Sequence, residues 1–187
     1  GDTVRTYFVE PGGVAEHQLI VQNKGNVKDT FDFFLEAPPD GVYRVLTDYE
    51  GFPELSSIFV EGRMLEPVID GSGLVFLHMK GCVLFFCRDV RLVERLEVVP
   101  ETRVEVFVDP ERSDLDYGWA RWDIAAEGGG ALVRYEMEMV PQFWIPPVIG
   151  PLIIKAALRL RGLRAARRLE AVASGRPIPE DIRVQRS

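Results

Sequence analysis

The stretch of sequence that decides the fold is PQFWIPP at residues 141–147, together with the helix-forming run that follows it at about 149–173. The prolines interrupt regular structure, and beyond them apolar residues recur at helical spacing. Nearly everything before residue 141 has the pattern of β-strands. A single long helix after a series of antiparallel strands can bury its apolar side only in the concave face of their sheet. The sequence therefore predicts an α+β domain in which a curved antiparallel sheet wraps around a C-terminal helix.

Strand patterns alternate with turn signals throughout the first 141 residues. Clusters of proline, glycine and asparagine bound the apolar runs, as is typical of turns between strands. A short helix is expected between residues 40 and 51, and a second short turn or helix at 52–55. The main strands are expected at 30–36, 58–66, two within 74–100, 103–109, 115–126 and 131–141, with two shorter ones at 3–9 and 16–22.

Length and composition indicate one domain. The 187 residues, of which 47% are hydrophobic, are enough for one sizeable core. We expect an N-terminal extension at 1–29 that adds strands to the same domain, the main domain at 30–173, and a C-terminal tail at 174–187. Because the sequence begins at Gly1 without an initiator methionine, we expect that an upstream segment has been removed, which leaves the compartment open.

The charge balance bears on the class of partner. The chain has 29 acidic and 22 basic residues and a net charge of −7, which argues against nucleic acid as its main partner. No run of about 18 apolar residues is free of charge, so we do not expect a membrane span.

The two cysteines, Cys82 and Cys87, lie five residues apart. On one continuous strand they would face opposite sides, too far apart for a disulfide. We therefore expect two buried thiols, and a disulfide only if a hairpin around residues 83–86 brings them together. With His17 and His78 they form no recognised ligand set, so we expect no metal and no cofactor.

Several short motifs, taken in order, resemble a known superfamily. APP at 37–39, LTDYEGFP at 46–53, WDI at 122–124 and VRY at 133–135 follow one another as in the START-like helix-grip superfamily (SRPBCC). That superfamily contains polyketide cyclases/dehydrases, lipid-transfer domains and coenzyme Q-binding chaperones. The resemblance spans roughly residues 30–173. It implies a helix-grip fold, with about six or seven strands around a long C-terminal helix and one or two short helices after the first family strand.

The motif FWIPP at 143–147, with Gly150 and Pro151, resembles a subgroup of exported bacterial members of uncharacterised role. This resemblance favours an exported or periplasmic location over a cytoplasmic one.

Alternation along the strands predicts which side chains face the helix. One face of each late strand is apolar, and the helix presents its own apolar stripe. This pattern also fits an ordinary filled core. The resemblance favours a ligand cavity, because concave sheets of this kind commonly hold small apolar molecules. The residues expected to line it are Trp122, Ile124, Val133, Tyr135, Met137, Met139, Leu92, Leu96, Ile149, Ile153, Ala156 and Leu160.

Three polar residues on apolar faces are the candidates for acid/base chemistry. Glu94 is in phase with the apolar residues of its strand, so it either points inward with a raised pKa or turns outward at a bulge. His78 is in phase with two apolar neighbours, although a structural role is favoured for a lone histidine. Tyr135 offers a hydroxyl from the predicted wall. Neither histidine has a nucleophile at a recognisable spacing, so we expect no catalytic triad.

Basic residues crowd the C-terminal helix. Residues 155–187 contain nine basic and three acidic side chains. The favoured interpretation is a solvated face paired with acidic strands. The alternative is a surface for anionic lipid headgroups, beside an apolar edge that enters the membrane interface. Its contact residues would be Phe143, Trp144, Ile145, Arg164 and Arg168.

Together these features favour a carrier or chaperone that binds a lipid, isoprenoid or sterol-like molecule between sheet and helix. The first alternative is a cyclase/dehydrase-type enzyme acting on an aromatic or polyketide-like substrate. The second is a protein-interaction module with a closed core. The sequence predicts neither the ligand's identity nor the oligomeric state.

Overall fold

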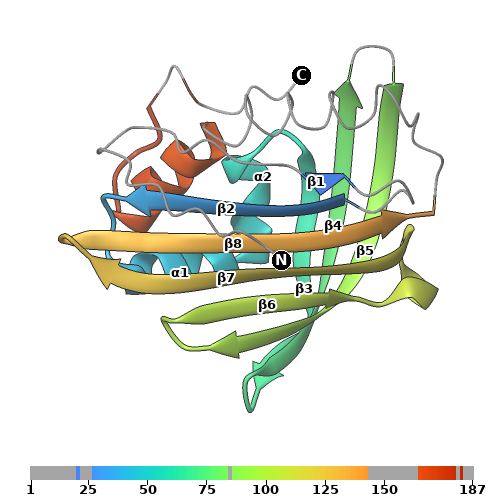
Figure 1. Ribbon diagram of the computed structural model, residues 1–187, viewed down its shortest axis with the longest axis horizontal. Helices are drawn as coiled ribbons and strands as arrows, with labels where there is room; N and C mark the ends of the chain where they lie inside the picture. Colours follow the sequence, from blue (N-terminus) through green and yellow to red (C-terminus); the bar gives the residue numbers. More distant parts are fainter. Residues whose placement is uncertain (1–19, 22–26, 84–85, 143–163, 180–181, 183–187) are drawn as a thin grey trace.

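The computed structural model describes residues 20–21, 27–83, 86–142, 164–179 and 182 (Figure 1). Its elements are β1 (Ile20–Val21), β2 (Val27–Leu35), α1 (Pro39–Thr47), η1 (Tyr49–Gly51), α2 (Phe52–Leu55), β3 (Phe59–Ile69), β4 (Ser72–Val83), β5 (Phe86–Val99), β6 (Arg103–Val108), η2 (Pro110–Arg112), β7 (Leu115–Glu127) and β8 (Gly130–Pro141). Residues 164–173 form a further helix. The strands expected at 3–9 and at most of 16–22, and the first part of the expected long helix, lie outside the described residues.

All the described strands form one antiparallel sheet in the order β1-β2-β8-β7-β6-β5-β4-β3. Sequence neighbours pair through hairpins from β3 to β8, whereas β2 pairs with β8 at the other end of the chain. The three short helices occupy the connection between β2 and β3. In Figure 1, β2, β8 and β7 run across the direction of β4 and β5, so the sheet is strongly curved. The predicted α+β helix-grip fold is confirmed, with seven long strands and the two-residue β1.

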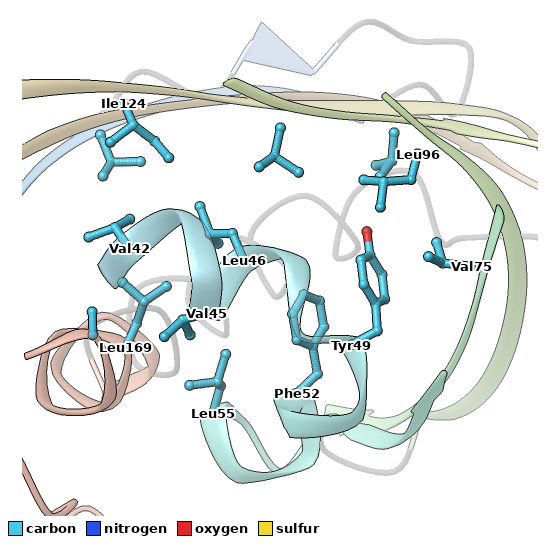
Figure 2. Close-up of a cluster of buried hydrophobic side chains, with 14 of the residues drawn as sticks. Val42, Val45, Leu46, Tyr49, Phe52, Leu55, Val75, Leu96, Ile124 and Leu169 are labelled. Atoms are coloured by element: carbon cyan, nitrogen blue, oxygen red, sulfur yellow. The ribbon is translucent and has the colours of Figure 1, made fainter. Parts of the chain in front are cut away.

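The short helices lie in the concavity of this sheet. Pro39 begins α1, where a missing N–H costs nothing, and the helix buries one apolar side that includes Val42 and Leu46. Figure 2 shows these side chains beneath the sheet, with Ile124 and Leu96 above them. The core is therefore formed between the inner face of the sheet and the helices.

Helix 164–173 is fixed to α1 by close backbone approach. A Cβ atom on Gly41 would lie 2.2 Å from the carbonyl oxygen of Ala173, so only glycine fits at this contact. The side chain of Glu170 accepts a hydrogen bond from the Glu36 N–H at 3.1 Å, and Ser174 donates to the Glu36 carbonyl at 2.9 Å. The predicted tail is not entirely loose, because Ile182 is buried against the domain.

The expectation of two buried thiols is wrong. The register of β4 and β5 pairs Cys82 with Cys87 across a hairpin. Cys87 is exposed and disulfide-bonded, and Cys82 is the other cysteine of the sequence. The chain reverses between the two residues, so the separation argued for a continuous strand does not apply.

Candidate functional site

The inner face of the sheet, defined as the face that carries α1, η1 and α2, is a continuous apolar wall. Strand register aligns its side chains in rows across the sheet. One row runs from Val98 through Val104 and Trp122 to Tyr135, and the next runs from Leu96 to Met137. Eight of the predicted lining residues lie on this face, namely Trp122, Ile124, Val133, Tyr135, Met137, Met139, Leu92 and Leu96. Whether they contact a ligand stays a prediction. Ile149, Ile153, Ala156 and Leu160 lie outside the described residues.

Aromatic rings cover the β2–β8–β7 part of this wall. Tyr135 stacks on Phe31 with centroids 6.0 Å apart and tilts against Trp122 at 4.8 Å. Its hydroxyl donates a hydrogen bond to the sulfur of Met137 at 3.2 Å. Sulfur is a weak acceptor, so this hydrogen bond is a weak one.

Glu94 interrupts the apolar wall. It lies on β5, in register with Val75 of β4 and Val108 of β6, and its side chain is only 7% exposed. Among the described residues none forms a hydrogen bond or ion pair with its carboxyl group. Burial raises the pKa of Glu94 from its ordinary 4.5 to about 7. The inward orientation expected from alternation is thus confirmed, and the outward bulge is excluded.

Tyr49 reaches the same region from the opposite side. It lies on η1, is 1% exposed, and points its hydroxyl toward Leu96 of the sheet (Figure 2). Burial chiefly, and then the charges of Glu94 and Tyr135, raise the pKa of Tyr49 well above 10. Glu94 raises the pKa of Tyr49, but Tyr49 does not shift the pKa of Glu94, because Tyr49 is still neutral when Glu94 titrates. Three oxygen-bearing side chains, from β5, η1 and β8, therefore meet in the apolar interior.

Sequence analysis did not include Tyr49 in the site. Its helical spacing with Val42, Val45 and Leu46 was the available signal, since a residue on the apolar side of α1 and η1 must face the sheet. The pattern could not show that Glu94 lies close enough for its charge to affect the pKa of Tyr49.

His78 is not part of this interior, so its assignment as a catalytic candidate is wrong. The inward residues of β4 are Val75, Leu77 and Met79, which places His78 on the outer face. There its Nε2 lies 2.5 Å from a carboxylate oxygen of Asp89. This hydrogen bond is the main reason that the pKa of Asp89 is lowered. The structural role that the sequence favoured for His78 stays a prediction.

Arg168 is likewise misassigned as a membrane contact. Its side chain is 7% exposed and donates hydrogen bonds to the carbonyl oxygens of Leu55, at 2.9 Å, and Ile182. Burial, and secondarily the charge of Arg164, lower the pKa of Arg168. Arg164 is exposed, as the hypothesis requires. Phe143, Trp144 and Ile145 lie outside the described residues.

The chemical capacity of the site follows from these groups. A carboxyl group with a pKa of about 7 can donate or accept a hydrogen bond near neutrality, and can transfer a proton. In the part of the chain that the structure describes, no group of three or more histidine, cysteine or carboxylate side chains is arranged to hold a metal ion. None of the described helices is long and apolar enough to cross a membrane.

Comparisons with known proteins agree with this geometry. A family model described as "Polyketide cyclase / dehydrase and lipid transport" matches residues 27–174. No curated protein matches the sequence.

Solved structures with the same fold belong to proteins of different kinds. The Zhui aromatase/cyclase from Streptomyces sp. R1128 is 14% identical over 79% of this chain and 93% of its own, with a TM-score of 0.62. A START superfamily protein from Mycobacterium smegmatis is 16% identical over 80% and 97%, with a TM-score of 0.59. Human STARD10 is 13% identical over 85% and 74%, with a TM-score of 0.59. At these identities the likeness shows the fold alone.

Proposed function

The chain belongs to the polyketide cyclase/dehydrase and lipid transport family, and from this membership we propose that it binds a hydrophobic small molecule between the inner face of its sheet and its C-terminal helix. The ligand would be a lipid, isoprenoid or sterol-like compound, and the protein its carrier or chaperone. The observation that carries this proposal is the inner face itself, a wall of apolar side chains interrupted by a buried carboxyl group that no described residue pairs with.

The composition of the wall supports an adaptable binding surface. All four methionines of the chain contribute to this face, namely Met64, Met79, Met137 and Met139. Methionine is flexible and polarisable, so it accommodates ligands of varied shape. Half-buried aromatic rings beside them add flat apolar area.

Glu94 favours a ligand over a closed core. A carboxyl group buried without a partner costs folding free energy, and an apolar residue of similar volume would avoid that cost. An interaction module with a filled interior has no use for such a group. A binding site does, because a few polar groups among apolar walls orient the ligand.

Native mass spectrometry of the purified protein, followed by extraction of bound molecules, tests the proposal. We expect an apolar molecule in a one-to-one complex. Ala120→Phe, on the inner face of β7, should reduce the bound fraction, whereas Ala125→Phe, exposed on the same strand, should not. A protein that is purified without a ligand and binds no apolar molecule when one is added would refute the proposal.

A second candidate, a cyclase/dehydrase-type enzyme, is supported by the same carboxyl group. An acid with a pKa near neutrality is suited to general acid/base catalysis. Tyr135 carries a hydroxyl on the same face of the sheet. An enzyme would convert an aromatic or polyketide-like substrate, with turnover lost in Glu94→Gln while binding persists. A carrier would release its ligand unchanged.

A further inference from the structure

The described elements packed around Glu94 offer it apolar side chains and tyrosines. On β5 itself the inward neighbours are Leu92 and Leu96, and across the sheet they are Val75 and Val108. Among the described titratable groups, Tyr49 on η1 is the one whose pKa Glu94 affects, and Tyr135 on β8 affects the same tyrosine. Arg91 and Arg95, which flank this stretch of β5, are exposed on the outer face.

No cation among the described residues therefore compensates Glu94. An ionised carboxylate in such surroundings is strongly disfavoured, so the group retains its proton up to about neutral pH. A neutral carboxylic acid has one O–H donor and an acceptor oxygen. No described residue forms a hydrogen bond with the O–H or the acceptor oxygen of Glu94. Buried polar groups without partners are rare in proteins, so this one calls for a functional explanation.

We propose that Glu94 recognises a single uncharged oxygen group, a hydroxyl or a carbonyl, on an otherwise apolar ligand. The inference rests on the ligand-binding function proposed above and specifies its ligand class. Tyr49 lies near enough to Glu94 for the carboxylate to raise its pKa, so the tyrosine belongs to the same part of the interior. The described neighbours of Glu94 on the wall, among them Val75, Leu92 and Val108, are apolar, so we expect the ligand to carry its polarity at one position.

The same geometry discriminates against charged ligands. A fatty acid would bring a second negative charge into a region that already disfavours one. An amine would have to lose its hydration in a wall without further acids. A neutral alcohol or ketone avoids both costs and satisfies the carboxyl group.

The protonation state of Glu94 makes the affinities for an alcohol and for a ketone depend differently on pH. A carbonyl accepts only from the protonated acid, whereas a hydroxyl can donate to the carboxylate as well. With a pKa of about 7, roughly 3% of Glu94 is protonated at about pH 8.5, so the apparent affinity for a ketone should fall about thirtyfold between about pH 5.5 and pH 8.5. The affinity for the matched alcohol should change by less than about threefold.

The test uses a hydrocarbon, a primary alcohol, a methyl ketone and a fatty acid of one chain length, each displacing the neutral fluorescent probe aminoanthracene. In the wild-type protein we expect alcohol and ketone to bind better than hydrocarbon at the lower pH, and the fatty acid to bind worst at the higher pH. Glu94→Gln should make ketone binding independent of pH, because the amide keeps a donor without titrating. Glu94→Leu should leave alcohol and ketone no better than hydrocarbon. Glu127→Gln, exposed at the end of β7, is the matched control.

The outcomes separate this inference from the function on which it rests. Equal binding of all four ligands, unaffected by Glu94→Gln, would overturn the recognition role and leave the carrier function standing. An amine of the same chain length, added to the panel as a fifth ligand, would also overturn it by binding best at high pH, since Glu94 would then act as a counter-ion. Failure of the protein to bind the probe or any of the four ligands would refute the carrier function and this inference together.

Discussion

Replacing Glu94 with glutamine should stabilise the folded protein at alkaline pH. Burial raises the pKa of this group from 4.5 to about 7 in the folded state. At about 1.4 kcal/mol per pH unit, that gap corresponds to about 3 kcal/mol. The glutamine amide is close in size, remains neutral, and carries no such cost.

The sign follows from proton binding. Below pH 4.5 the carboxyl group is protonated in both the folded and the unfolded chain, so it contributes no pH dependence. Between pH 4.5 and about 7 the unfolded chain loses this proton while the folded protein retains it. The unfolded state then binds fewer protons, and the free energy of unfolding falls as the pH rises. Above about pH 7 the loss is complete and the curve levels.

Urea denaturation of ligand-free protein measures this effect. The free energy of unfolding should be compared at about pH 4 and pH 8 for the wild type, Glu94→Gln and the exposed control Glu127→Gln. The advantage of Glu94→Gln over the wild type should grow by about 3 kcal/mol between these values, whereas that of the control should stay within about 0.5 kcal/mol. Parallel pH profiles for all three proteins would refute the inference that Glu94 is buried without a partner.

Three further predictions test other parts of the structure. Gly62→Ala should lower the free energy of unfolding by about 1–3 kcal/mol in a denaturant titration, because the added Cβ would lie 2.1 Å from the carbonyl oxygen of Tyr49. Arg168→Met should cost about 2–3 kcal/mol through its lost hydrogen bonds, while exposed Arg164→Met should be nearly neutral; equal effects would contradict the burial of Arg168. If the basic helix contacts membranes, replacing Trp144 and Arg164 together should reduce sedimentation with anionic vesicles but not with neutral ones, and unchanged sedimentation would exclude that surface.

The fold was predictable because its signals are local. Alternation identified the seven long strands, and turn signals separated all of them except β4 from β5. Alternation placed Glu94 in phase with Leu92 and Leu96 but left open whether a bulge turns it outward, and its burial shows that it points inward. The first long strand was predicted to begin at residue 30 and begins at Val27.

The misassignment of His78 shows where alternation fails. Every residue from Leu74 to Leu77 is apolar, so the pattern does not choose a face. The outer face is itself partly apolar there, because Phe76 is covered by the guanidinium of Arg63, 4.8 Å from its ring centre, and Val93 is buried although it faces outward. Such covering groups come from distant residues and leave no mark in the local sequence.

Long-range contacts also explain the errors at Arg168 and the cysteines. A run of basic residues on a helix does not show that one of them turns inward to the carbonyl of Leu55, 113 residues earlier in the chain. The residues between Cys82 and Cys87 contain none of the glycine, asparagine or proline that usually mark a hairpin. The register of two long strands, more than the turn, sets this pair opposite each other.

The most direct measurement of ligand binding in the interior is NMR of protein labelled at its methionine and isoleucine methyl groups. All four methionines lie on the inner face, whereas the methyl groups of Ile69, 67% exposed at the end of β3, provide an external reference. For a bound apolar ligand we expect nuclear Overhauser effects from its protons to the methyl groups of Met137 and Met139, and none to Ile69. A ligand that binds without contacting any methionine methyl group would contradict a site between the sheet and the C-terminal helix.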